Sequence, residues 1–352
     1  DYSHRKEWIR RRLESLVSAM SVDVLTYAIM SNHIHVILRN RPDIVATWSD
    51  KEVATRWLKV FPGRRIEEQL AAPSETDVEA LVNNAEQLQK VRERLSDISW
   101  FMRALAEPIA RMANHQDECT GRFWEGRFKA QRIVDETGLL ACSMYVDLNP
   151  IRAAMAQSLE QALHTSAYDR LAGQRGQEID SAAFDLVVLS HEVAGDFHKH
   201  KTVAQQKEEL KKQGRHIQRK NGRRIRRDGW LAPLTLSTEV LSTDPQAHRE
   251  GLRASDRGFL RLDWDDYVSL LRWTAQDASH DTHGADHEVA QSVLNRIGID
   301  GEVWRDVVWN FKRYFGQSSC AGQSDAMAEH AQQHGKRWHR GQRHLQGSVR
   351  PN

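Results

Sequence analysis

Two histidines separated by one residue lie near the start of the sequence. His33 and His35 belong to the stretch YAIMSNHIHVILRN, residues 27–40, whose apolar character predicts β-structure. Residues i and i+2 of a strand project from the same face, so the two imidazoles would stand side by side. Neutral imidazoles are good ligands for a divalent metal. The pair therefore indicates either two ligands of a metal site or two half-buried polar side chains with one hydrogen bond each.

A tyrosine and an asparagine four residues apart form a second pair with chemical potential. Tyr145 and Asn149 would lie on one face of a helix. A phenol is a weak nucleophile at neutral pH unless the charge that it creates is stabilised, and a metal that polarises a phosphodiester provides this stabilisation. The Asn149 carbonyl oxygen can then serve as a third ligand. The alternative is a half-buried helix aromatic followed by a C-terminal cap.

Cations and aromatic residues alternate in GRFWEGRFKAQRIV, residues 121–134, which we expect to be strand or loop. This pattern suits single-stranded nucleic acid, because bases stack on aromatic rings and phosphates pair with cations. The alternative is a strand whose aromatic residues fill the core and whose cations are solvated. The residues concerned are Arg122, Phe123, Trp124, Arg127, Phe128 and Lys129.

A strongly basic run occupies residues 211–227 and contains nine Lys and Arg without an acid. Such runs are usually solvated and mobile, but this one creates a strong local field for a polyanion. We therefore predict contact with DNA. The cations are Lys211, Lys212, Arg215, Arg219, Lys220, Arg223, Arg224, Arg226 and Arg227.

The remaining pattern predicts the elements that must position these groups. Ser31 and Asn32 interrupt the apolar run, which predicts strands over residues 23–30 and 33–39 joined in a tight hairpin. Apolar residues at helical spacing predict helices over residues 4–20, 48–60 and 76–114, with a break or kink at Pro108. A further helix should begin near Asp135 or Thr137 and stop at Asn149, before Pro150.

The composition is that of an ordinary soluble protein of 352 residues with a formal net charge of +2, so the overall charge does not indicate a polyanion partner. Three cysteines, Cys119, Cys142 and Cys320, are scattered without metal-type spacing, which fits a reducing cytoplasm. No apolar run approaches the length of a membrane span, and no signal peptide is visible.

A shift in composition near residue 170 predicts a catalytic domain over residues 1–172, a linker over 173–255 and a helical module over 256–345.

Three segments together resemble one family. In chain order, the segments are MSNHIHVIL, ARMANHQDECTGRFWEGRFKAQRIVDETGLL and YVDLNPIRAAMA. They are similar to the REP-associated tyrosine transposases, which are single-tyrosine members of the HUH endonuclease superfamily. The superfamily is named for two histidines that flank a hydrophobic residue, as in residues 33–35. The family's motif Tyr-Ile-x-x-Asn-Pro-Val resembles residues 145–151 in order and spacing. The resemblance covers residues 4–170, and the C-terminal part resembles the extension of longer members.

This resemblance implies an α+β fold, with a ferredoxin- or RRM-like antiparallel sheet that carries helices on one side (the HUH palm), plus a mainly helical C-terminal extension. It implies that His33, His35 and Asn149 hold Mg²⁺ or Mn²⁺ and that Tyr145 attacks the phosphate of single-stranded DNA. The products would be a 5′-phosphotyrosine link and a free 3′-hydroxyl. The DNA would be the hairpin of a repetitive extragenic palindrome. The protein would act in the cytoplasm, on the nucleoid, as a monomer or a homodimer.

One departure concerns the first strand. Members of the family begin with the central strand of the sheet, whereas here a helix is expected almost at Asp1. We therefore expect a segment upstream of Asp1 that supplies this strand. If the strand is truly absent, a catalytically silent, domesticated DNA-binding protein is the alternative function. A hydrolase that uses water instead of tyrosine would need carboxylates near the histidines, and residues 27–42 contain none.

Overall fold

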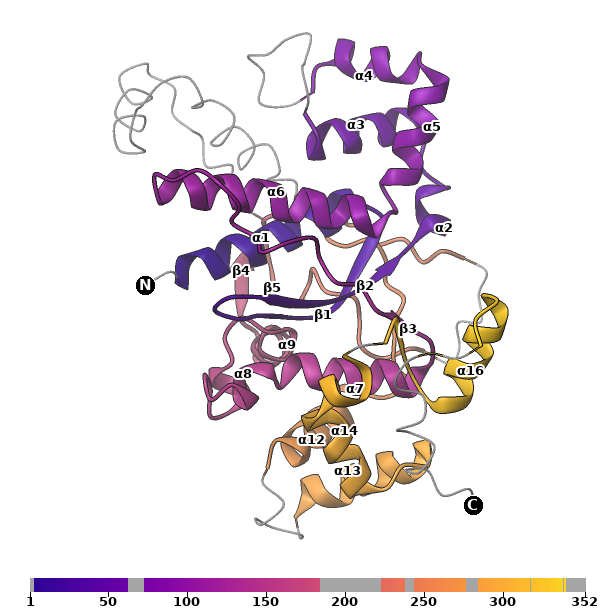
Figure 1. The fold of residues 1–352 in the computed structure, drawn as a ribbon. Helices are drawn as coiled ribbons and strands as arrows, with labels where there is room; N and C mark the ends of the chain where they lie inside the picture. The colour runs from indigo at the N-terminus through magenta and orange to yellow at the C-terminus, as the bar shows by residue number, and fades with distance from the viewer. Residues whose placement is uncertain are drawn as a thin grey trace.

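The computed structural model describes residues 3–62, 73–183, 223–237, 244–276, 284–316, 318–337 and 339. These parts of the chain form helices around three small two-stranded sheets, which confirms the α+β class (Figure 1). The largest of the three sheets is a hairpin rather than a complete ferredoxin-like sheet. The HUH palm therefore stays a prediction.

The predicted hairpin is confirmed. Strands β1 (Val22–Ile29) and β2 (Ile34–Asn40) pair in antiparallel fashion, with Ala28 opposite His35. The Met30 N–H donates to the His33 carbonyl oxygen at 2.9 Å, which closes the connection around Ser31 and Asn32. This short turn fixes the register and so places both histidines at the closed end of the hairpin.

Helices cover both faces of the hairpin, in contrast to the one-sided arrangement that the resemblance implied (Figure 1). Helices α1 (Ser3–Ala19) and α6 (Ile98–Gln116) pack on one face, and α7 (Glu136–Asp147) packs on the other. The reason is that both faces are apolar. Val36 and Leu38 belong to the core with α1 and α6, whereas Leu25 and Ile37 belong to the core with α7. A sheet with two apolar faces must be covered twice.

The prediction of one helix over residues 76–114 is wrong, because three helices occupy this range. They are α4 (Glu75–Val82), α5 (Ala85–Arg94) and α6, and they follow α2 (Pro42–Val45) and α3 (Asp50–Val60). Two N-caps divide them. The Asn84 side chain accepts from the Gln87 N–H, and the Asp97 side chain accepts from the Trp100 N–H.

The helix α6 continues through Pro108, so of the predicted break or kink the break does not occur. Proline has no N–H and therefore leaves the carbonyl four residues earlier without its helical donor. In this protein that carbonyl belongs to Ala104, and it accepts from the buried Arg12 Nε at 3.0 Å. A side chain of α1 thus replaces the lost backbone hydrogen bond and fastens the two helices together.

The segment of residues 121–134, which precedes the helix that carries Tyr145, is mostly loop. It ends in strand β3 (Arg132–Ile133), which pairs in parallel with β6 (Cys320–Ala321). As predicted, α7 begins after Asp135, whose carboxylate accepts from the Gly138 N–H. It ends at Asp147, two residues before the predicted end. The short helix α8 (Asn149–Arg152) follows, with Pro150 in its first turn, where its missing N–H is tolerated.

Among the described residues, the C-terminal half is helical mainly from residue 264 onward, and residues 223–263 form one short strand and loops. Its elements are η1 (Leu159–Gln161), α9 (Ser166–Gln174), β4 (Glu178–Asp180), β5 (Arg224–Arg226), α12 (Trp264–Ala275), α13 (Ala285–Ile297), α14 (Gly301–Trp309), α15 (Phe311–Phe315) and α16 (Ser324–Gln333). One hydrophobic core joins Tyr145 of α7 to Tyr267 and Phe311 of these helices. Trp230, within the predicted linker, is fully buried against Tyr27 of β1, with ring centroids 5.3 Å apart. The packing is therefore continuous across both predicted domain boundaries.

Backbone groups of β1 that do not bond to β2 find partners in later segments. The Ile29 N–H donates to the His164 carbonyl oxygen at 2.9 Å, and the Val24 carbonyl oxygen accepts from the Ala232 N–H at 3.1 Å. Arg170 donates to the Leu25 carbonyl oxygen at 2.9 Å. Loops and the side chains of Arg170 and Ser166, whose hydroxyl accepts from the Tyr27 N–H at 3.1 Å, thus cover this edge among the described residues. None of the described helices combines the length and the apolarity needed to cross a membrane.

Candidate active site

The two histidines form a close pair at the end of the hairpin. The Nε2 atoms of His33 and His35 are 3.1 Å apart, and the ring planes are nearly perpendicular. The His33 Nδ1 lies 2.7 Å from the Asn32 Oδ1, which can only accept, so Nδ1 carries the proton. The lone pair of the neutral His33 ring is then on Nε2, the atom that faces His35. A hydrogen bond on the far nitrogen is the usual way to orient a metal-binding imidazole.

The tyrosine helix brings Tyr145 to this pair. The rings of His35 and Tyr145 meet edge to face with their centroids 5.3 Å apart. The contact arises because α7 packs directly on β1 and β2. A strand pair and a helix that are far apart in the sequence thus bring His33, His35 and Tyr145 together, and their metal-binding and catalytic roles stay predictions.

Asn149 lies beside the backbone of Tyr145 and is 7% exposed. Its Nδ2 donates to the Tyr145 carbonyl oxygen at 2.8 Å. This bond is the helix-capping role that the sequence offered as the alternative to a metal ligand. The two roles use different atoms, since a metal would be bound through Oδ1. The ligand role of Asn149 therefore stays a prediction.

Electrostatics keep both imidazoles neutral. Burial lowers the pKa of His35 to about 4, and the nearby His33, Lys312 and Arg152 contribute in the same direction. Burial and Lys312 also lower the pKa of His33. Desolvation and like charges both disfavour the protonated ring. At neutral pH the pair therefore offers lone pairs rather than positive charges.

Three residues that sequence reasoning did not identify complete the surroundings of Tyr145. The Phe311 ring stacks on the Tyr145 ring with centroids 4.5 Å apart, and the Arg152 Cζ lies 4.7 Å from the Tyr145 centroid. Arg152 also donates to the Trp309 carbonyl oxygen. Lys312, next to Phe311, supplies a positive charge close to both histidines. Arg152 follows the Asn-Pro pair directly, but no spacing in the sequence connects residues 309–312 with Tyr145.

The segment of alternating cations and aromatic residues divides into two parts. Phe123 and Trp124 are half-buried against the core around α6, and the Trp124 Nε1 donates to the Ala106 carbonyl oxygen at 2.9 Å. Phe128, in contrast, is 43% exposed. The cations Arg122, Arg127 and Lys129 are also exposed. The first two aromatic residues thus anchor the loop, and the other side chains face solvent, where the predicted DNA contact stays a prediction.

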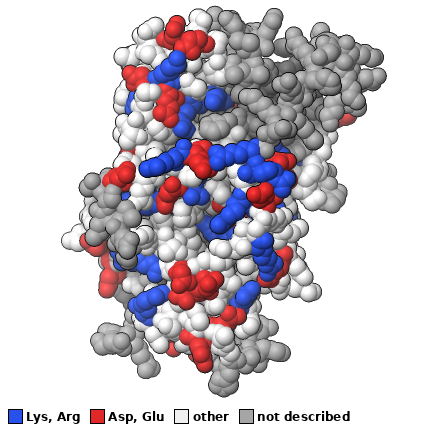
Figure 2. Space-filling view, turned by 180° about the vertical axis from the view of Figure 1, so that it is seen from behind, with Lys and Arg blue, Asp and Glu red and all other residues white. Residues whose placement is uncertain are grey.

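The basic run is only partly described. Lys211, Lys212, Arg215, Arg219 and Lys220 lie outside the described residues. The four remaining arginines each lie close to a carboxylate: Arg223 to Glu250, Arg224 to Glu178, Arg226 to Asp228 and Arg227 to Asp169. On the face shown in Figure 2, Lys and Arg side chains are interspersed with Asp and Glu side chains. These four arginines are thus already paired with carboxylates, and only the pair of Arg227 with Asp169 is largely buried, so their contact with DNA stays a prediction.

Comparison of the chain with models of protein families, with curated proteins and with solved structures found no match.

Proposed function

We propose that this protein is a metal-dependent single-strand DNA endonuclease and strand transferase of the REP-associated tyrosine transposase kind, with Tyr145 as the nucleophile. The observation that supports this proposal is the contact between the Tyr145 ring and His35, within a pair of neutral imidazoles. A tyrosine beside potential metal ligands is an arrangement that suits nucleophilic attack on a phosphodiester. The order of these residues in the sequence follows the same family pattern.

Three side chains of the site could supply part of the ligand set of a divalent cation. His33 and His35 would supply two nitrogen ligands and Asn149 an oxygen ligand through Oδ1. Imidazole suits Mn²⁺ better than Mg²⁺, which prefers oxygen, so we expect Mn²⁺ to support the higher activity. When bound, either ion polarises the non-bridging oxygens of the scissile phosphate.

The chain's own residues carry the chemical step. The Tyr145 oxygen attacks the phosphorus in line, so that a P–O bond to tyrosine forms while the bond to the 3′-oxygen breaks. The phenol loses its proton and the 3′-oxygen gains one, so the proton count balances. Arg152 and Lys312 place positive charge where the phosphate would develop negative charge. The 5′-phosphotyrosine keeps the phosphodiester free energy, so joining to a new end needs no ATP.

The expected substrate is single-stranded DNA that carries a hairpin of the repetitive extragenic palindrome type, encountered on the nucleoid in the cytoplasm. The exposed cations Arg122, Arg127 and Lys129 offer a surface for its phosphates, and the exposed ring of Phe128 can stack on a base. This assignment rests on the resemblance of the sequence and on the exposure of these side chains.

A second function is favoured by one observation. Tyr145 is only 4% exposed, and Phe311 stacks on its ring. A nucleophile must reach a phosphate, so a permanently covered phenol would fit a DNA-binding protein that no longer cuts. The two functions share their DNA-binding surface and differ only in the covalent step.

A denaturing gel distinguishes them. A hairpin oligonucleotide labelled at its 3′ end is incubated with the full chain and Mn²⁺ or Mg²⁺, because the 5′-phosphotyrosine retains the 3′ portion of the DNA. We expect labelled protein with the wild type, none with Tyr145→Phe, and unchanged labelling with Tyr314→Phe, which removes another phenol of the region. An adduct in Tyr145→Phe would exclude Tyr145 as the nucleophile. Binding without any adduct in the wild type would favour the non-cutting protein.

A further inference from the structure

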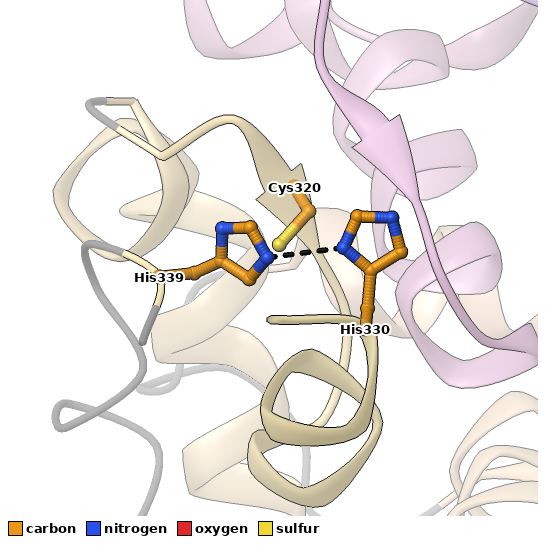
Figure 3. Close-up of side chains that lie close together, drawn as sticks. All are labelled: Cys320, His330 and His339. Carbon is orange, nitrogen blue, oxygen red and sulfur yellow. Dashed lines mark hydrogen bonds between the residues drawn. The ribbon is translucent and has the colours of Figure 1, made fainter. Parts of the chain in front are cut away.

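A second group of potential metal ligands lies in the C-terminal part of the fold, apart from the histidine pair of the hairpin. It consists of Cys320 in β6, His330 in α16 and His339 shortly after that helix (Figure 3). One ligand atom from each residue lies within 4.8 Å of the other two. Cys320 and His339 are buried, and His330 is partly buried. A thiol and two imidazoles have thus been brought together below the surface.

We propose that Cys320, His330 and His339 bind a zinc ion, and that this site fastens the C-terminal segment to the tyrosine helix. Zinc is typically bound by thiolate and imidazole in tetrahedral geometry, in which neighbouring ligand atoms are about 3.3 to 3.6 Å apart. The His330 Nδ1 and the His339 Nε2 are already 3.0 Å apart. The distances from the Cys320 sulfur would need to shorten by about 1.2 Å at most, since all three atoms lie within 4.8 Å of one another. The site is independent of the proposed DNA chemistry.

The surroundings orient His339 for this role. Its Nδ1 lies 3.2 Å from the Ser319 hydroxyl oxygen, which can accept the Nδ1 proton. The lone pair of the neutral ring is then on Nε2, the atom that faces His330 and Cys320. Such a bond on the far nitrogen is typical of metal-binding histidines.

His330 requires a change of tautomer. Its Nε2 lies 3.4 Å from the Arg132 Nη1, which can only donate, so in the ion-free protein the ring proton is on Nδ1 and faces His339. Zinc binding would move this proton to Nε2 and release the thiol proton of Cys320 to solvent. The side chain of Arg132 is exposed and can turn away from the protonated Nε2.

His334 is the neighbouring imidazole that does not join the group. Its ring stacks on His330 with centroids 4.1 Å apart. Its Nδ1 bonds to the His330 carbonyl oxygen at 2.9 Å, and its Nε2 lies 3.4 Å from Arg132. Both nitrogens are thus engaged outside the cluster, so we assign the fourth position of the ion to water. His334 also provides a matched control.

The position of the site explains what the ion would do. Cys320 pairs with Arg132 in the parallel contact of β6 with β3, and β3 leads directly into α7. Next to it, the Gln323 N–H donates to the Asp135 carboxylate at 2.6 Å. An ion at Cys320 would therefore hold α16 and the following segment against the start of the helix that carries Tyr145.

Cobalt provides the probe, because a thiolate bound to Co²⁺ gives a charge-transfer absorption in the near ultraviolet. The full chain is stripped with EDTA, dialysed and titrated with Co²⁺, then with Zn²⁺. We expect the band of a tetrahedral thiolate site, with an amplitude that corresponds to one thiolate-bound Co²⁺ per chain, and its displacement by Zn²⁺. Co²⁺ at the histidine pair of the hairpin has no thiolate ligand and would not contribute to this band. His33→Ala together with His35→Ala should leave the band unchanged, as should Cys119→Ser, which removes an exposed thiol.

The variants decide the ligand set. Cys320→Ser should abolish the band, and His330→Asn and His339→Asn should each weaken Co²⁺ binding at least tenfold, while His334→Asn should retain it. Zn²⁺ should raise the melting temperature of the wild type more than that of His339→Asn, which keeps the test valid if Cys320→Ser does not fold. No band in the wild type, or an equal band in Cys320→Ser or His339→Asn, would overturn the proposal.

Discussion

The imidazoles of His33 and His35 are the residues on which metal dependence should rest. Replacing both with Ala should lower the rate of adduct formation at least about 100-fold, because a Lewis acid supplies several kcal/mol to phosphodiester attack and each 1.4 kcal/mol is tenfold. DNA binding should persist. The measurement is the rate of covalent labelling with Mn²⁺, compared with that of His115→Ala, which removes an exposed histidine. Undiminished labelling in EDTA would contradict the metal role.

The buried, neutral ring of His35 should make the unfolding free energy depend on pH under acidic conditions. Burial and positive neighbours lower the pKa of His35 to about 4, whereas a histidine in the unfolded chain titrates near 6.5. Between these values the unfolded chain binds a proton that the folded chain does not. The stability that depends on this difference in proton binding at His35 is fully present above about pH 6.5, and it is lost as the pH falls towards 4.

His35→Gln should therefore flatten the decrease of the unfolding free energy between pH 6.5 and 4.5, measured by urea denaturation. Comparison with the wild type removes the contributions of the other histidines. The His35 ring resonances should also titrate near pH 4. Titration of that ring near pH 6.5 would show that it is not buried as described.

At the scale of elements, α7 depends on its first residues. The Asp135 carboxylate accepts from the Gly138 N–H at 2.5 Å within α7 and from the Gln323 N–H at 2.6 Å, just before α16. Loss of an N-cap typically costs about 1 kcal/mol, and the second bond adds to this. We expect Asp135→Ala to lower the unfolding free energy by about 1 to 2 kcal/mol. Asp135→Asn keeps the capping oxygen and should cost less, so equal losses would mean that capping is not the cause.

The elements show where sequence reasoning succeeds and where it fails. The hairpin was predictable because Ser31 and Asn32 form a turn signal that interrupts a long apolar run within residues 23–39. The division of residues 76–114 was missed because the apolar spacing continues through Asn84 and Asp97, whose capping bonds end one helix and begin the next. The continuity of α6 at Pro108 depends on Arg12, which no local pattern connects to Ala104.

For the whole molecule, the order of motifs predicted that His35 and Tyr145 would meet, but it did so through a family resemblance rather than through physics alone. The contacts of Phe311 and Lys312 with that site arise from packing between distant helices. The group at Cys320 was missed for the same reason. Cys320, His330 and His339 are more widely spaced than the ligands of the common zinc motifs, and they come together through the pairing of β6 with β3 and the placement of α16.

The basic run allows a prediction for the full chain in which one half serves as the control for the other. Each phosphate contact that is lost should lower the slope of log K against log salt by about 0.7 for single-stranded DNA. Changing Lys211, Lys212, Arg215, Arg219 and Lys220 to Gln should therefore reduce the slope by up to about 3.5 if all of them contact phosphate. Arg223, Arg224, Arg226 and Arg227 are already close to carboxylates, so their Gln variant should change the slope less and the stability more.

Fluorescence anisotropy of a labelled hairpin between about 50 and 200 mM salt measures both slopes. Because the control variant removes almost as many cations, a general effect of net charge would lower both slopes alike. Contact with DNA through Lys211, Lys212, Arg215, Arg219 and Lys220 would instead lower the slope of the first variant more than that of the control. If the first variant keeps the wild-type slope, residues 211–220 do not contribute to DNA binding, and the phosphate contacts must come from surfaces such as the exposed cations around Phe128.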